Sequence, residues 1–125
     1  MNSRKFKYLL LIQLIMLLGI VLSPQTSYAQ KFLPTKLKVT VINGQGNAVK
    51  NATVRLFLSE EDYIDDKKSI LSEKTNEKGQ VIFKKMKPRS YYIDARKGDL
   101  NNDGRGSKTD KLKEGRVNRV NVVIE

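Results

Sequence analysis

The pattern that most limits how this chain can fold is a series of short segments in which apolar and polar residues alternate. In Lys36–Ile42 (KLKVTVI), Leu37, Val39 and Val41 share one side, and lysines and a threonine occupy the other. A repeat of two residues is the period of a β-strand with one buried face. This segment is therefore predicted to be a strand on the surface of a hydrophobic core.

Further segments with strand character follow, and residues that favour turns separate them. The turns are predicted at Asn43–Gly46, Asn76–Gly79 and Lys87–Ser90, and the strands at Ala52–Leu58, Ser69–Thr75, Gln80–Lys85, Tyr91–Arg96 and Arg116–Glu125. Six or seven short strands with turns about every ten residues are typical of a β-sandwich. The predicted fold is a small, all-β, six- to seven-stranded Greek-key sandwich.

Three details of this prediction can be tested against a structure. In Ala52–Leu58 the alternation directs Leu58 toward the core and Phe57 to the opposite face, at a sheet edge or in a partner site. Ser59–Lys68 is predicted to be a surface loop or a short helical turn capped by Ser59. Gly98–Gly115 is predicted to be a polar excursion between the last two strands.

The N-terminal segment has the three parts of a secretory signal. Basic residues within Met1–Lys7 precede the apolar block Tyr8–Leu22, and Ser27 and Ala29 place small residues where signal peptidase cleaves. The alternative is a membrane anchor, but a span requires about 20 apolar residues and this block is shorter. We therefore expect residues 1–29 to be a signal peptide and residues 30–125 to be one exported domain. The chain is expected to contact the membrane only through the signal peptide, before cleavage.

Charge and composition narrow the functions that the exported part can have. The chain has 24 Lys and Arg against 13 Asp and Glu; without residues 1–29 the basic residues number 21 and the net charge is +8. This charge suggests loose attraction to polyanionic surfaces such as lipid headgroups or acidic glycans, with simple solubility as the preferred explanation. No basic motif interleaved with aromatic residues indicates nucleic-acid binding. Cysteine and histidine are both absent, which excludes disulfides, catalytic triads with histidine and the usual zinc sites. A non-enzymatic role is therefore expected, with a hydrolase based on carboxylates as the alternative.

The strand and turn residues resemble a known family. The matching motifs are Leu37-x-Val39-x-Val41, Gly46-x-x-Val49-x-x-Ala52, Thr75-x-x-x-Gly79-x-Val81-x-Phe83 and Pro88-x-x-Tyr91-x-Ile93-x-Ala95. Together they resemble the carboxypeptidase regulatory-like domain, a transthyretin-like (prealbumin-like) β-sandwich. The resemblance implies an accessory module that positions a neighbouring domain or contacts glycans and proteins. The expected location is the periplasm or the cell surface, or the protein is secreted.

The segment Asp99–Asp110 has the spacing of a calcium loop. Oxygen ligands at alternate residues and a central glycine suit a hard cation with many ligands. The candidate ligands are Asp99, Asn101, Asp103, Ser107 and Asp110. The alternative is an ordinary turn rich in Asn, Asp and Gly, and Arg105 and Lys108 place positive charge near the site. No other cofactor is expected.

Two further hypotheses concern side chains on the strands. Phe57, Tyr63 and Tyr92 are candidates for an aromatic platform that binds a sugar ring, although an exposed tyrosine that covers a sheet edge is the commoner case. A Lys–Asn isopeptide bond, as in related collagen-adhesin B-type sandwiches, would join Lys36 or Lys38 to Asn118 or Asn121. The alternation directs these side chains toward solvent, so the sequence does not favour this bond.

Overall fold

The computed structural model describes residues 3–21, 33–105 and 108–125 and contains seven strands and two helices. The elements are α1 (Ser3–Val21), β1 (Lys36–Asn43), β2 (Thr53–Phe57), α2 (Glu60–Ile64), β3 (Leu71–Lys74), β4 (Gln80–Phe83), β5 (Tyr92–Lys97), β6 (Leu100–Asn101) and β7 (Val117–Ile124). None of the helices within these residues is long and apolar enough to cross a membrane. The predicted cleavage site at Ser27–Ala29 lies outside the described residues, so the signal peptide stays a prediction.

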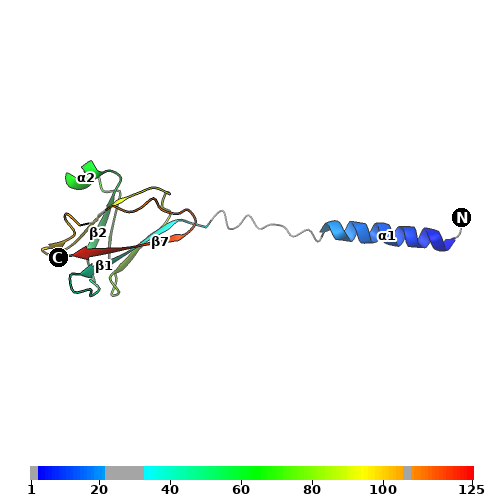
Figure 1. The fold of residues 1–125 in the computed structure, drawn as a ribbon, viewed down its shortest axis with the longest axis horizontal. Coiled ribbons are helices and arrows are strands. Elements are labelled where there is room, and N and C mark those ends of the chain that lie inside the picture. The colour runs from blue at the N-terminus through cyan, green and yellow to red at the C-terminus, as the bar shows by residue number, and fades with distance from the viewer. Residues whose placement is uncertain (1–2, 22–32, 106–107) are drawn as a thin grey trace.

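The strands form two sheets, as the sequence predicts. One sheet has the order β4-β1-β7 and the other β3-β2-β5-β6. The first and last strands, β1 and β7, lie side by side and parallel (Figure 1), whereas the other strand pairs are antiparallel. The all-β sandwich is confirmed.

The core lies between the sheets and contains the residues that the alternation assigns to it. Leu37, Val39 and Val41 of β1 are fully buried. The other strands supply Val54, Leu56, Val81, Phe83, Ile93, Ala95, Val122 and Ile124 to the same cluster. Because neighbouring residues of a strand point to opposite faces, the residues between these side chains form the two outer faces of the sandwich.

Two predictions about the end of β2 are wrong. Leu58 is exposed, because β2 ends at Phe57 and the chain turns away to Ser59 before the alternation can continue. Phe57 lies on the outer face as predicted, but it is fully buried and belongs to an inner strand, so it does not lie at a sheet edge. Tyr63 of α2 packs edge-on against it at 5.9 Å, and the Arg55 guanidinium lies 5.5 Å from its ring centre.

The helical turn and the polar excursion have different outcomes. Ser59 caps α2, because its Oγ accepts a hydrogen bond of 3.1 Å from the Asp62 amide. Gly98–Gly115, in contrast, is more than a polar excursion. It contains β6, and three of its side chains, Asn102, Thr109 and Leu112, are buried.

Candidate functional site

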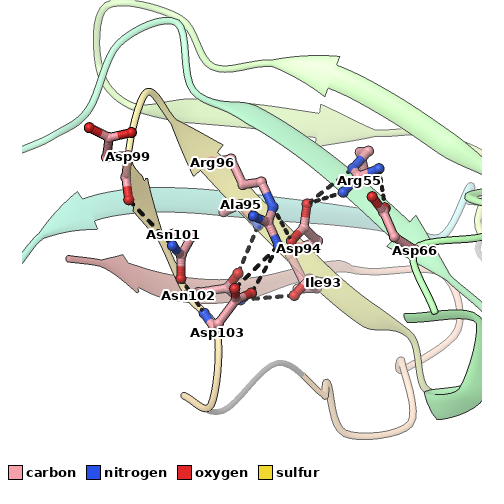
Figure 2. A network of polar contacts seen from close by, with 10 residues as sticks. All are labelled: Arg55, Asp66, Ile93, Asp94, Ala95, Arg96, Asp99, Asn101, Asn102 and Asp103. Carbon is pink, nitrogen blue, oxygen red and sulfur yellow. Dashed lines mark hydrogen bonds and ion pairs between the residues drawn. The ribbon is translucent and has the colours of Figure 1, made fainter. Parts of the chain in front are cut away.

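The outer face of the four-stranded sheet carries a chain of alternating charges around Asp94 (Figure 2). Asp94 is only 2% exposed. Its Oδ2 accepts from Arg55 Nη2 at 2.7 Å and its Oδ1 from Arg96 Nε at 2.9 Å. Arg55 also contacts Asp66, and Arg96 contacts Asp103 at 3.0 Å. The carboxylate is thus buried beneath two arginines, and the strand register explains why: Arg55 of β2 lies directly opposite Asp94 of β5.

Electrostatics favour the charged forms of both arginines. Burial by itself lowers the pKa of Arg55, but the hydrogen bonds and charges of Asp94 and Asp66 outweigh it and raise this pKa. The pKa of Arg96 is raised in the same way, against burial, by Asp94 and Asp103. A raised pKa stabilises the fold fully below the usual arginine pKa, and this contribution is lost only as the pH rises through the higher, folded-state pKa. The arginines therefore add no pH dependence near neutrality.

Asn102 continues the hydrogen bonding of β5 where β6 has ended. Its Oδ1 accepts from the Ala95 amide at 2.9 Å, and its Nδ2 donates to the Ile93 carbonyl at 2.8 Å. The side chain is fully buried, so these contacts satisfy backbone groups that would otherwise lack partners. A single asparagine side chain therefore replaces a strand partner here (Figure 2).

The three aromatic residues that the sequence singles out do come together. Phe57 and Tyr63 pack edge to face, and Tyr63 stacks on Tyr92 with ring centres 6.1 Å apart at 29°. The Lys108 ammonium lies 5.6 Å from the centre of the Tyr92 ring. Phe57 is the buried base of this aromatic patch, and Tyr63 and Tyr92 are half-buried.

A surface pocket of about 490 Å³ adjoins the aromatic patch. Its lining residues are Leu58, Ser59, Glu60, Arg89, Ser90, Tyr92 and Lys108. Arg89 is held in place because its Nη2 donates to the Leu58 carbonyl at 3.0 Å. The site therefore combines one aromatic wall with two cations, one carboxylate and two hydroxyls.

The candidate calcium ligands are only partly brought together. Asp99, Asn101 and Asp103 lie at the β5–β6 end of the sheet, where Asn101 Oδ1 accepts from the Asp103 amide at 3.0 Å (Figure 2). The carboxylate of Asp103 contacts Arg96. Asp110 follows Thr109, whose amide bonds to Tyr91 at the opposite end of β5. At about 3.3 Å per residue, the length of β5 separates it from Asp99. Ser107 lies outside the described residues.

The residues proposed for an isopeptide bond have other partners. Lys36 and Lys38 alternate with the buried side chains of β1. Asn118 Oδ1 accepts from the Lys113 amide at 2.8 Å, and its Nδ2 donates to the Lys36 carbonyl at 3.2 Å. The buried acid Asp94 belongs to the other sheet, on its outer face. The acid that such a bond requires therefore lies away from the paired strands that carry the lysines and asparagines.

Sequence reasoning missed Arg89, Lys108 and the Asp94 network as parts of this surface. The alternation of β2 and β5 already places Arg55, Asp94 and Arg96 on the outer face. The pairing of these two strands, which lie 39 residues apart at Arg55 and Asp94, is what brings their charges together. A search for opposite charges at outward positions of different strands would have found this network.

Comparison with known proteins yields a likeness of fold. No family model and no curated protein matches the chain. The Bacillus anthracis TIE protein matches 74% of this chain with 17% identity and a TM-score of 0.55, over 16% of its own length. A streptococcal ancillary pilin matches 74% with 13% identity and a TM-score of 0.56, over 32% of its length.

A third solved structure, the group B streptococcus pilus 2b backbone protein, matches 72% of the chain with 14% identity and a TM-score of 0.54. The match covers 40% of that protein, so the chain spans well under half of each of these three structures. Identities this low establish a shared fold only, and they do not single out the carboxypeptidase regulatory-like family. The chain is therefore similar, in its β-sandwich fold, to single portions of longer solved proteins.

Proposed function

We propose that this chain is an exported, non-catalytic β-sandwich module of the carboxypeptidase regulatory-like kind, which acts at the cell envelope by binding a glycan. The signal-like N-terminus supports export. The names of two similar structures, an ancillary pilin and a pilus backbone protein, support a structural role at the cell surface. The glycan, and not a protein, is the preferred ligand because of the aromatic patch.

The observation that carries this proposal is the assembly of Phe57, Tyr63 and Tyr92 beside the pocket. Small-molecule sites have apolar or aromatic walls, with a few polar groups that fix the orientation of the ligand. The exposed part of Tyr92 offers a surface on which the C–H face of a sugar ring can pack. Ser59, Ser90 and Glu60 line the same pocket and can bond to the sugar hydroxyls.

The alternative of a hydrolase based on carboxylates has less support. Such an enzyme needs at least two acidic side chains that face one cleft. The pocket beside Tyr92 has a single carboxylate among its lining residues, Glu60. The arrangement therefore favours binding over chemistry.

A glycan microarray tests the binding proposal directly. We expect the exported chain to bind a subset of glycans, and Tyr92→Ala to weaken binding at least about tenfold, equivalent to about 1.4 kcal/mol. Ile82→Ala is a matched control, because Ile82 is also exposed but belongs to the other sheet. Equal binding by Tyr92→Ala and the wild type would contradict the proposal, as would a chain that binds a protein partner and no glycan.

Cell fractionation tests export. We expect the protein outside the cytoplasm, with an intact mass that begins at Gln30. A cytoplasmic protein that retains Met1–Ala29 would contradict this part of the proposal and leave the binding site unaffected.

A further inference from the structure

The two sheets of the sandwich differ in the charges that their strands carry. The strands of the three-stranded sheet contain Lys36, Lys38 and Arg119 and no acidic residue. The strands of the four-stranded sheet contain Glu73 and Asp94 as well as bases. The positive charge of the three-stranded sheet therefore has no acidic counterpart within its strands, whereas two acids offset part of the positive charge of the other sheet.

The strand register places these three bases on one outer face. Leu37 and Val39 point into the core, so Lys36 and Lys38 point outward. In the same way Val120 and Val122 face the core, so Arg119 faces outward, and Arg119 is the direct neighbour of Lys38 across the β1–β7 pair. We call Lys36, Lys38 and Arg119 the basic face.

The spacing of the basic face follows from sheet geometry. Residues two apart along a strand are separated by about 6.6 Å, and neighbouring strands by about 4.8 Å. Lys84 is exposed directly after β4 and adds a fourth positive charge. Leu37 of β1 lies opposite Phe83 of β4. Continuing this antiparallel register by one residue places Lys84 opposite Lys36. The four basic residues therefore occupy neighbouring backbone positions on one face of the sheet, about 5–7 Å apart.

Few acidic side chains near the basic face can neutralise it. Among the described residues, the ion pairs involve other bases: Lys50, Arg55, Arg96 and Arg105. Glu77 and Glu125, at the ends of the strands, are engaged with Lys50 and Arg105. Glu114 lies in the turn before β7. Asp110 lines one surface pocket with Arg119, but the bases Lys111, Lys113 and Arg116 line it too and outnumber this single carboxylate. The cations of the basic face therefore remain available to a partner.

We propose that the basic face binds an extended acidic polysaccharide. A linear polymer with an anionic group on each repeating unit can contact cations at successive positions on a flat sheet, and each contact releases counterions from the polymer. This site lies on the opposite sheet from the aromatic patch and does not depend on it. The module would then bind one glycan at the aromatic patch on the four-stranded sheet and an acidic polysaccharide at the basic face on the three-stranded sheet.

Two other polyanions fit this face less well. Single-stranded nucleic acid is bound by stacking of its bases on aromatic side chains, and the outward residues of β1, β4 and β7 include none. Binding within a membrane interface depends on Trp, Phe or Leu side chains that enter it. Here the exposed apolar residues are Ile82 and Val117, whose side chains are shorter than the lysines and the arginine around them.

Titration with fluorescent heparin oligosaccharides at several NaCl concentrations tests the proposal. The variant Lys36→Gln/Lys38→Gln/Arg119→Gln removes the basic face. We expect its affinity to fall more than tenfold and the slope of log K against log[NaCl] to decrease by about 2, at about 0.7 for each lost contact, as for single-stranded polyanions. Residues 30–125 serve for this test, because every buried residue that the structure describes lies within them.

The matched control is Lys67→Gln/Lys68→Gln/Lys74→Gln, which removes the same charge from exposed positions outside the basic face. We expect this control, and Tyr92→Ala, to bind heparin within about twofold of the wild type. Equal losses in the two triple variants would overturn the proposal, since net charge alone would then explain binding. Binding to phosphatidylglycerol vesicles without binding to heparin would also overturn it. Retained binding by Lys36→Arg/Lys38→Arg would support it.

Discussion

Asp94 is the residue on which the outer face of the four-stranded sheet depends most. Its carboxylate is nearly inaccessible to solvent, and two arginines bond to it from two directions. Removing one member of a buried ion pair leaves the other charge without compensation, and this costs more than the pair contributes. Any shift in the β2–β5 pairing would separate Arg55 from Asp94, so the network favours the observed register of these strands in addition to its effect on stability.

Asp94→Asn should lower the free energy of unfolding by about 2–3 kcal/mol, because Arg55 and Arg96 lose their shared anion. Chemical denaturation at neutral pH with EDTA measures this change. Asp99→Asn is the control: Asp99 is exposed, and its substitution should change stability by less than about 0.5 kcal/mol. Equal effects of the two substitutions would show that the network contributes nothing.

The turn from β3 to β4, which connects the two sheets, explains the spacing of the motif Thr75-x-x-x-Gly79. Thr75 Oγ1 donates to the Val49 carbonyl at 2.6 Å and accepts from the Ala52 amide at 2.9 Å. Gly79 has φ +70°, and an added Cβ would lie 2.7 Å from the Val41 carbonyl oxygen. This turn thus contacts both β1 and the segment before β2, and replacement of either residue should destabilise the fold.

Gly79→Ala should destabilise the protein by about 3 kcal/mol or more, since it combines a positive φ with a backbone clash. Gly98→Ala tests the conformational part alone: Gly98 has φ +57°, but no atom lies within 4 Å of an added Cβ. We expect this second substitution to cost about 1–2 kcal/mol. Thermal melts of both variants measure the difference, and equal melting temperatures would contradict the role assigned to Gly79.

The segment Asp99–Asp110 carries the calcium prediction, which remains to be tested. Asp103 would have to exchange Arg96 for the ion, and Asp110 lies at the opposite end of β5. We therefore expect weak binding, at about millimolar calcium. Such binding should raise the melting temperature by several degrees relative to EDTA, and Asp99→Ala should remove the increase. A melt that calcium leaves unchanged would reduce this segment to an ordinary turn.

The pairing of β1 with β7 joins the two ends of the sandwich domain within one sheet. These are the first and last strands of the sandwich, and they pair over eight successive positions, from Lys36–Val117 to Asn43–Ile124. Beyond β7, the amide of Glu125 bonds to the Asn101 carbonyl at 3.0 Å and so connects the two sheets. Although β7 lies at the edge of its sheet, it therefore pairs with the central strand β1 along its whole length.

Deletion of residues 117–125 should abolish cooperative unfolding, because Val122 and Ile124 leave the core and β1 loses one of its two neighbours. A urea titration followed by circular dichroism measures this loss. Deletion of Lys67 and Lys68 from the exposed segment after α2 is a control that should retain a cooperative transition. A cooperative transition in the C-terminal deletion would show that the remaining six strands suffice.

The sequence alone determined six of the seven strands, most of their buried faces and most of the turns, and it missed β6. This was possible because alternation and glycine placement act locally: Leu37, Val39 and Val41 share a face whatever their partners are. Two local signals misled the prediction. The alternation in Ala52–Leu58 continued one residue beyond the strand, and Asn102 carries no sequence sign that its side chain would be buried.

Only the tertiary structure decided which outward residues meet. Phe57, Tyr63 and Tyr92 form one patch because α2 folds back over the β2–β5 pair, and Asp110 is distant from Asp99 because the length of β5 separates them. The basic face likewise exists only because β7 returns to lie beside β1. Strand pairing is a contact over long distances in the sequence, and its free energy comes from the assembled core, so no local pattern specifies it.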